Sequence, residues 1–97
     1  MQDENMVSAT TFCVHHNIEL SFIHSLKEHG MIETVTVEEE IFVPLTQLER
    51  LEKIVRLHFE LDINLEGIET ITNLLDRMEE MQKDIQRLTN RLRAYED

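Results

Sequence analysis

The sequence predicts a mainly α protein in which two short helices are followed by a small β-hairpin, a third helix and a long C-terminal helix. Three observations predict this class. Apolar residues recur at helical spacing over the last third of the chain. Two β-branched or apolar runs, 32–37 and 41–43, flank three consecutive glutamates in the middle. Ser8 and Gly30 stand where a helix would begin and where another would stop.

The long helix is predicted from an uninterrupted apolar seam. Its steps alternate between three and four residues, which is the a/d pattern of a coiled coil. Asn64 is a good N-cap, and Gly67 is the last glycine of the chain. A helix over residues 65–95 would be roughly 45 Å long, whereas a compact chain of this size has a radius of gyration of about 13 Å. The seam consists of Ile71, Leu74, Met78, Met81, Ile85, Leu88, Leu92 and Tyr95.

Two interpretations of this seam are open. Its first turns could fold back on the N-terminal half, because Ile68 and Leu75 widen the apolar stripe into a core-type face. Farther along, the stripe narrows between polar flanking residues, which favours pairing with a second copy. We therefore expect a homodimer through the later seam positions: Met78, Met81, Ile85, Leu88, Leu92 and Tyr95.

The N-terminal half is expected to hold a helix-turn-helix. Residues 1–7 are polar and are predicted to be frayed, after which Ser8 begins a short helix that Asn17 ends. A second short helix is predicted over residues 19–29 and stops at Gly30. The residues expected to face inward from these helices are Ala9, Phe12, Cys13, His16, Phe22, Ile23 and Leu26.

Residues 31–43 change to a strand pattern and predict a hairpin, or wing, with Glu38, Glu39 and Glu40 between its strands. Because these positions hold no Gly, Asn or Asp, the turn does not fix the strand register. Pro44 then opens a leucine-rich helix over 45–61, predicted to be the central core element, with a break over 62–64. We expect one domain over 1–97, comprising the helix-turn-helix, wing and central helix (8–61) and the long helix (65–95).

Charge bounds the partners. The chain carries a net charge of −11, and its first 49 residues contain one basic side chain, Lys27, against nine acidic residues. This balance repels phosphate backbones and anionic lipid and favours basic partners. The single cysteine, Cys13, excludes an internal disulfide and fits a reducing compartment. With no apolar run that indicates a signal peptide or membrane span, the sequence predicts a cytoplasmic location.

No catalytic, metal or cofactor site is predicted. Of the possible ligands, only Cys13 and His16 have a spacing that could share a helical face, and no further ligand clusters with them. His15 and His16 are adjacent and are therefore expected to point apart on a helix, while His24 and His29 are five residues apart. The sequence also lacks a glycine-rich phosphate loop and a nucleophile with a base at usable spacing.

The order of elements, and the stretch from Val55 through Leu61-Asp62-Ile63-Asn64-Leu65-Glu66-Gly67-Ile68, resembles the winged helix-turn-helix domain of MerR-like regulators. More narrowly it is similar to the CbpM family of chaperone modulators. The resemblance covers about residues 7–95. It implies a small cytoplasmic protein that binds the J-domain of a DnaJ-like co-chaperone, CbpA, and inhibits it.

Three functions stay open. The first is J-domain regulation, for which the partner-binding residues are expected to be Glu33, Glu38, Glu39 and Glu40, because an acidic surface complements a basic J-domain helix. The second is DNA binding as a MerR-like transcriptional regulator. The segment 22–30 and the acidic wing lack the arginines and tyrosine with which such regulators reach phosphates, so DNA binding is disfavoured. The third is a structural subunit that only dimerises.

Overall fold

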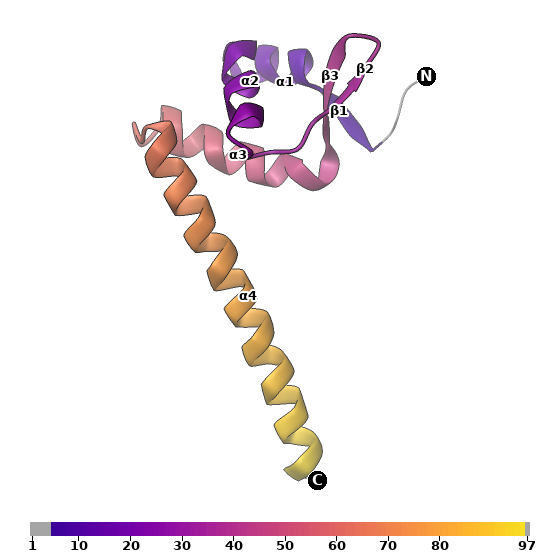
Figure 1. Cartoon of the computed structure of the whole chain (residues 1–97), viewed down its shortest axis with the longest axis vertical. Coiled ribbons are helices and arrows are strands. Elements are labelled where there is room, and N and C mark those ends of the chain that lie inside the picture. Colours follow the sequence, from indigo (N-terminus) through magenta and orange to yellow (C-terminus); the bar gives the residue numbers. More distant parts are fainter. Residues whose placement is uncertain (1–4, 97) are drawn as a thin grey trace. The chain divides into compact units, whose positions relative to one another are not determined.

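A computed structural model of the chain describes residues 5–96. The chain divides into two compact units, Met1–Asp62 and Ile63–Asp97, and each is taken by itself below. Over the described residues the protein has four helices and one three-stranded antiparallel sheet (Figure 1). The predicted mainly α class, with a winged helix-turn-helix arrangement and a long C-terminal helix, is confirmed.

Two short helices open the first unit as predicted. Helix α1 spans Ala9–His16, and the Ser8 hydroxyl at its N-cap accepts a hydrogen bond from the Thr11 backbone N–H. Asn17 ends α1 in the left-handed conformation, with φ of 57°. Helix α2 spans Leu20–Glu28, and Gly30 after it has φ of 69°, a value that glycine adopts without steric cost. These local signals placed both helices correctly to within a residue or two.

The sheet adds a strand that the sequence pattern does not indicate. Strand β1 (Met6–Ser8) pairs antiparallel with β3 (Glu40–Pro44), and β3 also pairs with β2 (Val35–Val37), giving the order β1-β3-β2. The prediction that residues 1–7 are frayed is therefore wrong for Met6 and Val7, while residues 1–4 lie outside the described part. The reason is tertiary: β3, far along the chain, supplies the hydrogen-bonding edge that orders this segment.

The hairpin between β2 and β3 turns through two residues. Val37 pairs with Glu40, so Glu38 and Glu39 form the loop, and both have positive φ, 49° and 66°. Two-residue hairpin loops of type I′ require this conformation at both positions. The hairpin projects from the helices of its own unit (Figure 1).

Helix α3 (Leu45–Phe59) supplies two fully buried core residues, Leu51 and Ile54. It begins after Pro44, as predicted, but ends at Phe59 rather than Leu61, which is 63% exposed. Asp62, with φ of 55°, follows in the left-handed region. The buried apolar residues of the first unit are Ala9, Phe12, Cys13, Ile23, Leu26, Met31, Ile32, Val43, Leu51 and Ile54.

The second unit is the single helix α4 (Leu65–Glu96). Asn64 caps it, because its Oδ1 accepts the backbone N–H of Gly67 at 2.7 Å. Ile68 and Thr72 are buried, whereas every described residue from 73 onward is exposed. The expectation that Leu75 belongs to a core-type face is therefore wrong, since 43% of it is exposed. None of the described helices is long and apolar enough to cross a membrane.

Candidate partner-binding surfaces

The hairpin tip carries three consecutive carboxylates. Glu38 and Glu39 occupy the two-residue loop, and Glu40 is the first residue of β3. All three are exposed. The Oε2 atom of Glu40 accepts a hydrogen bond of 2.8 Å from the Ser8 hydroxyl, which ties its side chain back to the start of α1. The tip therefore presents two free-standing carboxylates beside one that is held in place.

Glu33, which the sequence groups with this tip, lies at the opposite end of β2. It precedes the strand by two residues, and its backbone N–H donates to the Gln47 side-chain oxygen at 3.1 Å. The neighbouring Met31 carbonyl accepts a 2.7 Å hydrogen bond from Arg50 Nε. The structure thus brings Glu38, Glu39 and Glu40 together, while Glu33 stands apart from them on the loop that is joined to α3.

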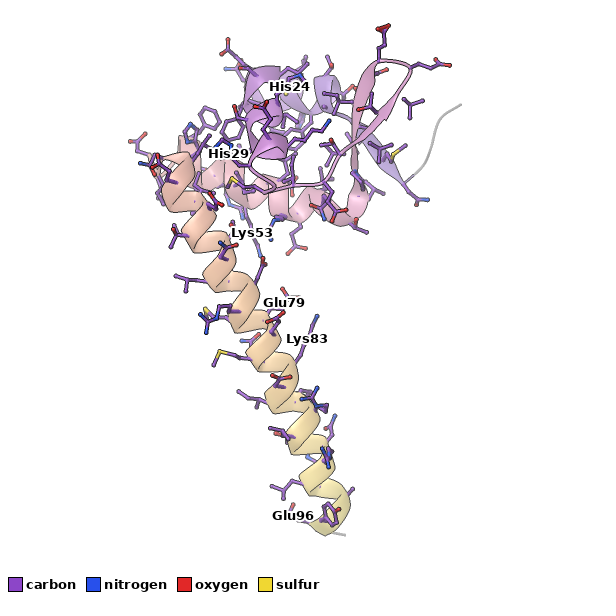
Figure 2. The ribbon with its side chains drawn as sticks, in the orientation of Figure 1. His24, His29, Lys53, Glu79, Lys83 and Glu96 are labelled. Atoms are coloured by element: carbon purple, nitrogen blue, oxygen red, sulfur yellow. The ribbon has the colours of Figure 1, made fainter. Side chains whose placement is uncertain are left out.

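Helix α2 occupies the second position of the helix-turn-helix, where a DNA-binding protein would place its recognition helix. Its exposed residues include His24, Lys27 and Glu28, so its single full positive charge is offset by a carboxylate. Figure 2 labels His24 and also His29, which follows the helix and whose Nδ1 is 2.8 Å from the Ser25 carbonyl oxygen. This helix lacks the row of cations that phosphate contacts require.

Three aromatic rings from α2 and α3 form a cluster that the sequence did not indicate. The Phe22 ring stacks on His58 with centroids 4.9 Å apart, and Phe59 meets Phe22 and His58 edge-on at 5.2 and 4.7 Å. Phe59 is 50% exposed, and the other two residues are half-buried. We call Phe22, His58 and Phe59 the aromatic cluster. The only sequence signal was the aromatic pair 58–59 at the end of a leucine-rich helix.

The apolar seam runs along α4 with its side chains in solvent. From Met78 to Leu92 its members are 55–61% exposed, and Tyr95 is 85% exposed. Charged side chains pair on the flanks and outer side of the helix, at Lys83–Glu79 (3.5 Å, both labelled in Figure 2) and Arg87–Asp84 (3.1 Å). None of these paired residues is a seam position, so the seam itself carries no charge. Helix α4 is therefore amphipathic from residue 73 onward, although none of the described residues there is buried.

The possible ligand pair Cys13 and His16 does not form a site. Cys13 is buried, and burial raises the pKa of its thiol above the ordinary value of 9.0. The His16 ring stacks on Phe12 at 4.0 Å, so it packs at the edge of the core. It also meets the His15 ring edge-on at 5.1 Å, so the expectation that these two side chains point apart is wrong. Between residues 5 and 96 no three His, Cys, Asp or Glu side chains converge in a way that could hold a metal ion.

Comparison with known proteins agrees with this architecture. The family model described as MerR HTH family regulatory protein matches residues 7–90. The chain is also 29% identical over 90 residues to the chaperone modulatory protein CbpM of Pseudomonas entomophila (strain L48), covering 88% of this chain and 85% of that protein. The family match spans both helices of the helix-turn-helix, the hairpin and most of α4. This chain belongs to the MerR helix-turn-helix family of regulatory proteins.

Proposed function

We propose that this protein is a chaperone modulator that binds the J-domain of a DnaJ/CbpA-like co-chaperone and inhibits it. The similarity to a chaperone modulatory protein over most of both chains supports the partner class. A cytoplasmic location, in contact with such a co-chaperone, is part of the proposal. No cofactor and no catalytic step are needed, because inhibition follows from occupying a surface that the co-chaperone uses.

The observation that carries the proposal is the exposed acidic tip of the hairpin. The partner implied by the resemblance to CbpM is a J-domain, and J-domains are expected to present a basic helix to Hsp70. Glu38 and Glu39 project at the end of a β-hairpin. Their negative charges can attract a basic partner before other parts of the two surfaces meet. Glu33, at the far end of β2, is included as a contact for a partner that lies along the strand.

We also propose that the functional form is a homodimer held by the α4 seam: Met78, Met81, Ile85, Leu88, Leu92 and Tyr95. A continuous apolar row that is more than half exposed favours a partner, and a second copy offers the same heptad pattern. Dimerisation would present two acidic tips per particle. If both tips could reach J-domains at once, binding to a multimeric co-chaperone would gain from a high effective concentration.

Calorimetry with the cognate J-domain tests the proposal. We expect binding heat for the wild-type protein and a reduced stimulation of Hsp70 ATPase by the co-chaperone. Reversing Glu38, Glu39 and Glu40 to Lys should slow association, mainly at low salt, because complementary charge acts on the association rate. The matched control reverses Glu69, Glu79 and Glu80, three exposed carboxylates of α4, and should bind like the wild type.

These experiments distinguish a wrong partner from a wrong binding surface. If the wild-type protein gives no binding heat and leaves the ATPase unchanged, the chaperone-modulator function is lost. If the wild type binds and the hairpin variant binds equally well, the function stands and the acidic tip is the wrong surface. Loss of binding in both charge-reversal variants would mean that the total charge, rather than the tip, governs the encounter.

The family match also favours a second candidate, a DNA-binding transcriptional regulator. A helix-turn-helix is an arrangement that many DNA-binding proteins use, whereas the charge of this one disfavours a duplex. Helix α2 offers Lys27 alone, and the wing that would flank the groove ends in Glu38 and Glu39. A purely structural subunit that dimerises without a further partner is the outcome left if both J-domain and DNA fail to bind.

A further inference from the structure

The aromatic cluster is built from elements other than the hairpin, since it joins the first turn of α2 to the C-terminal end of α3. Its rings fix one another: Phe22 and His58 stack with an interplanar angle of 28°, and Phe59 stands edge-on to both. Half of Phe59 nevertheless remains exposed to solvent. An exposed aromatic ring held by neighbouring rings loses little conformational freedom on binding, as is typical of residues that dominate interface energies.

Three carboxylates lie close to this cluster along the chain, in or next to the two elements that build it. Glu19 is the N-cap of α2, three residues before Phe22, and Glu60 is the C-cap of α3, directly after Phe59. Asp62 follows two residues later, and all three carboxylates are exposed. The C-terminal end of α3 carries the negative pole of its helix dipole, while the first turn of α2, at Phe22, carries the positive pole of its own. Arg56 is the one Lys or Arg among residues 56–62, so with histidine neutral the formal charge of this segment is negative.

An aromatic face with an acidic rim has a defined ligand chemistry. The face of an aromatic ring attracts an ammonium or guanidinium group, and nearby carboxylates strengthen the attraction to that cation. The apolar area of Phe59 also suits an aliphatic side chain or the methylene stem of Lys or Arg. A helix with basic and apolar residues one turn apart would offer both kinds of contact to this surface.

We propose that the aromatic cluster, with the carboxylates of Glu19, Glu60 and Asp62, is a docking site for a basic amphipathic helix of the partner protein. The inference rests on the proposed function, in which that helix belongs to the J-domain, and it assigns separate tasks to two surfaces. The acidic tip, together with the carboxylates of the docking site, governs how fast the partner arrives. The aromatic cluster governs how long it stays, because desolvated aromatic contacts act mainly on dissociation.

The decisive variant is Phe59→Ala, measured by surface plasmon resonance against the immobilised cognate J-domain. We expect the dissociation rate to rise by about tenfold or more while the association rate changes little. A second variant, Glu60→Gln with Asp62→Asn, removes the rim charge and keeps at position 62 a residue that tolerates positive φ. It should slow association at low salt. The matched control is Val14→Ala, which truncates another apolar residue, 77% exposed, on α1.

Each outcome bears on the proposal separately from the function. If the wild type binds and both Phe59→Ala and the rim variant match it, the docking site is overturned and the J-domain function survives. If Phe59→Ala instead weakens self-association in sedimentation, the cluster is a contact between copies and the docking site is overturned.

If the wild type does not bind the J-domain, the proposed function fails, and the surface is tested with a synthetic lysine–leucine amphipathic helix against a glutamate–leucine one. Amide shifts in labelled protein that centre on residues 22 and 58–59 with the basic peptide alone would support the site. Equal shifts with both peptides, or none at these residues, would overturn it. Circular dichroism confirms that each variant folds. If Phe59→Ala does not fold, the rim variant Glu60→Gln with Asp62→Asn tests the docking site in its place.

Discussion

Glu38 and Glu39 are an unfavourable choice for the conformation that they hold. Each is in the left-handed region, which costs a non-glycine residue about 1–2 kcal/mol, and a two-residue loop of this kind favours Asn-Gly. We expect the double variant Glu38→Asn, Glu39→Gly to raise the stability by about 1–2 kcal/mol, and so the melting temperature by about 5 °C or more. The same variant removes two charges from the tip and should slow association with the J-domain.

The contrast between these two effects is informative, because a more stable protein that binds more slowly is a sign of residues kept for their charge. Thermal unfolding by circular dichroism measures the first effect. The control, Glu28→Asn on α2, removes an exposed carboxylate at a position without positive φ and should not stabilise the protein. A melting temperature that falls in the double variant would contradict the strain at the tip.

Cys13 is the only thiol of the chain and is buried. Burial raises its pKa above 9.0, so the folded state favours the protonated thiol. Its contribution to stability is therefore fully present below the unfolded pKa and is lost as the pH rises through the higher folded pKa. We expect iodoacetamide at pH 8 to modify the native protein slower than the urea-unfolded protein by at least about tenfold, as measured by mass spectrometry. Equal rates would mean that Cys13 is accessible.

At this scale the sequence predicted what local chemistry decides. Ser8, Asn17 and Asn64 act at the helix ends where their side chains or conformations suit them, because a cap depends on its own few neighbours. The turn at Glu38 and Glu39 could not be placed in the same way. Strand pairing imposes its conformation against the residues' own preference.

Among the elements, the helices were predictable and the sheet was only partly so. Helical periodicity is a local property, and α1, α2 and α4 begin and end within a few residues of their predicted limits. Strand β1 has only three residues and depends on the edge of β3, so nothing in its own sequence marks it. Helix α3 ends at Phe59, and Asp62 follows in the left-handed conformation; the apolar pattern, which continues to Leu61, indicates neither.

The first turn of α4 gives a prediction about Gly67. Ala normally stabilises a helix by about 1 kcal/mol relative to Gly, but a Cβ at Gly67 would lie 2.9 Å from Ile63 Cγ2 and 3.1 Å from the capping oxygen of Asn64. We expect Gly67→Ala to yield no gain and to destabilise by up to about 1 kcal/mol, since the cap must shift.

Urea unfolding measures the effect. The matched control is Asn73→Ala, at an exposed position inside α4. Its free energy of unfolding should rise by about a few tenths of a kcal/mol, as helix propensity predicts. A stabilised Gly67→Ala variant would show that the cap tolerates the added methyl group.

For the whole molecule, the sequence was enough to predict the acidic tip and the α4 seam, but not the aromatic cluster. The acidic tip is a run of three neighbours, and the seam is a period within one helix. The aromatic cluster joins Phe22 to His58 and Phe59, which only the packing of α2 and α3 brings together. Sequence periodicity and charge can predict a surface that is built from one element. A surface shared by two helices depends on how the helices pack, which these patterns do not contain.

The overall charge yields a prediction about DNA. With a net charge of −11 and Lys27 as the single Lys or Arg before residue 50, the helix-turn-helix lacks the electrostatic contribution that supplies non-specific affinity. We expect no shift of random or palindromic duplexes at ~150 mM salt in an electrophoretic assay. Retention that weakens steeply with added salt would support the regulator alternative, and a DNA-binding MerR-type protein serves as the positive control.

The last prediction concerns the assembly. From residue 73 onward α4 has no buried described residue, yet its seam is apolar at every a and d position through Tyr95. We expect a dimer in sedimentation at micromolar concentration, and Ile85→Asp should raise the dissociation constant by at least about a hundredfold, because pairing would bury an unpaired charge. Asn90→Asp adds the same charge on the opposite side of the helix and should leave the dimer intact. A wild-type monomer unchanged by Ile85→Asp would leave the seam without a role in self-association, whereas a dimer disrupted equally by both variants would place the contact outside the a/d face.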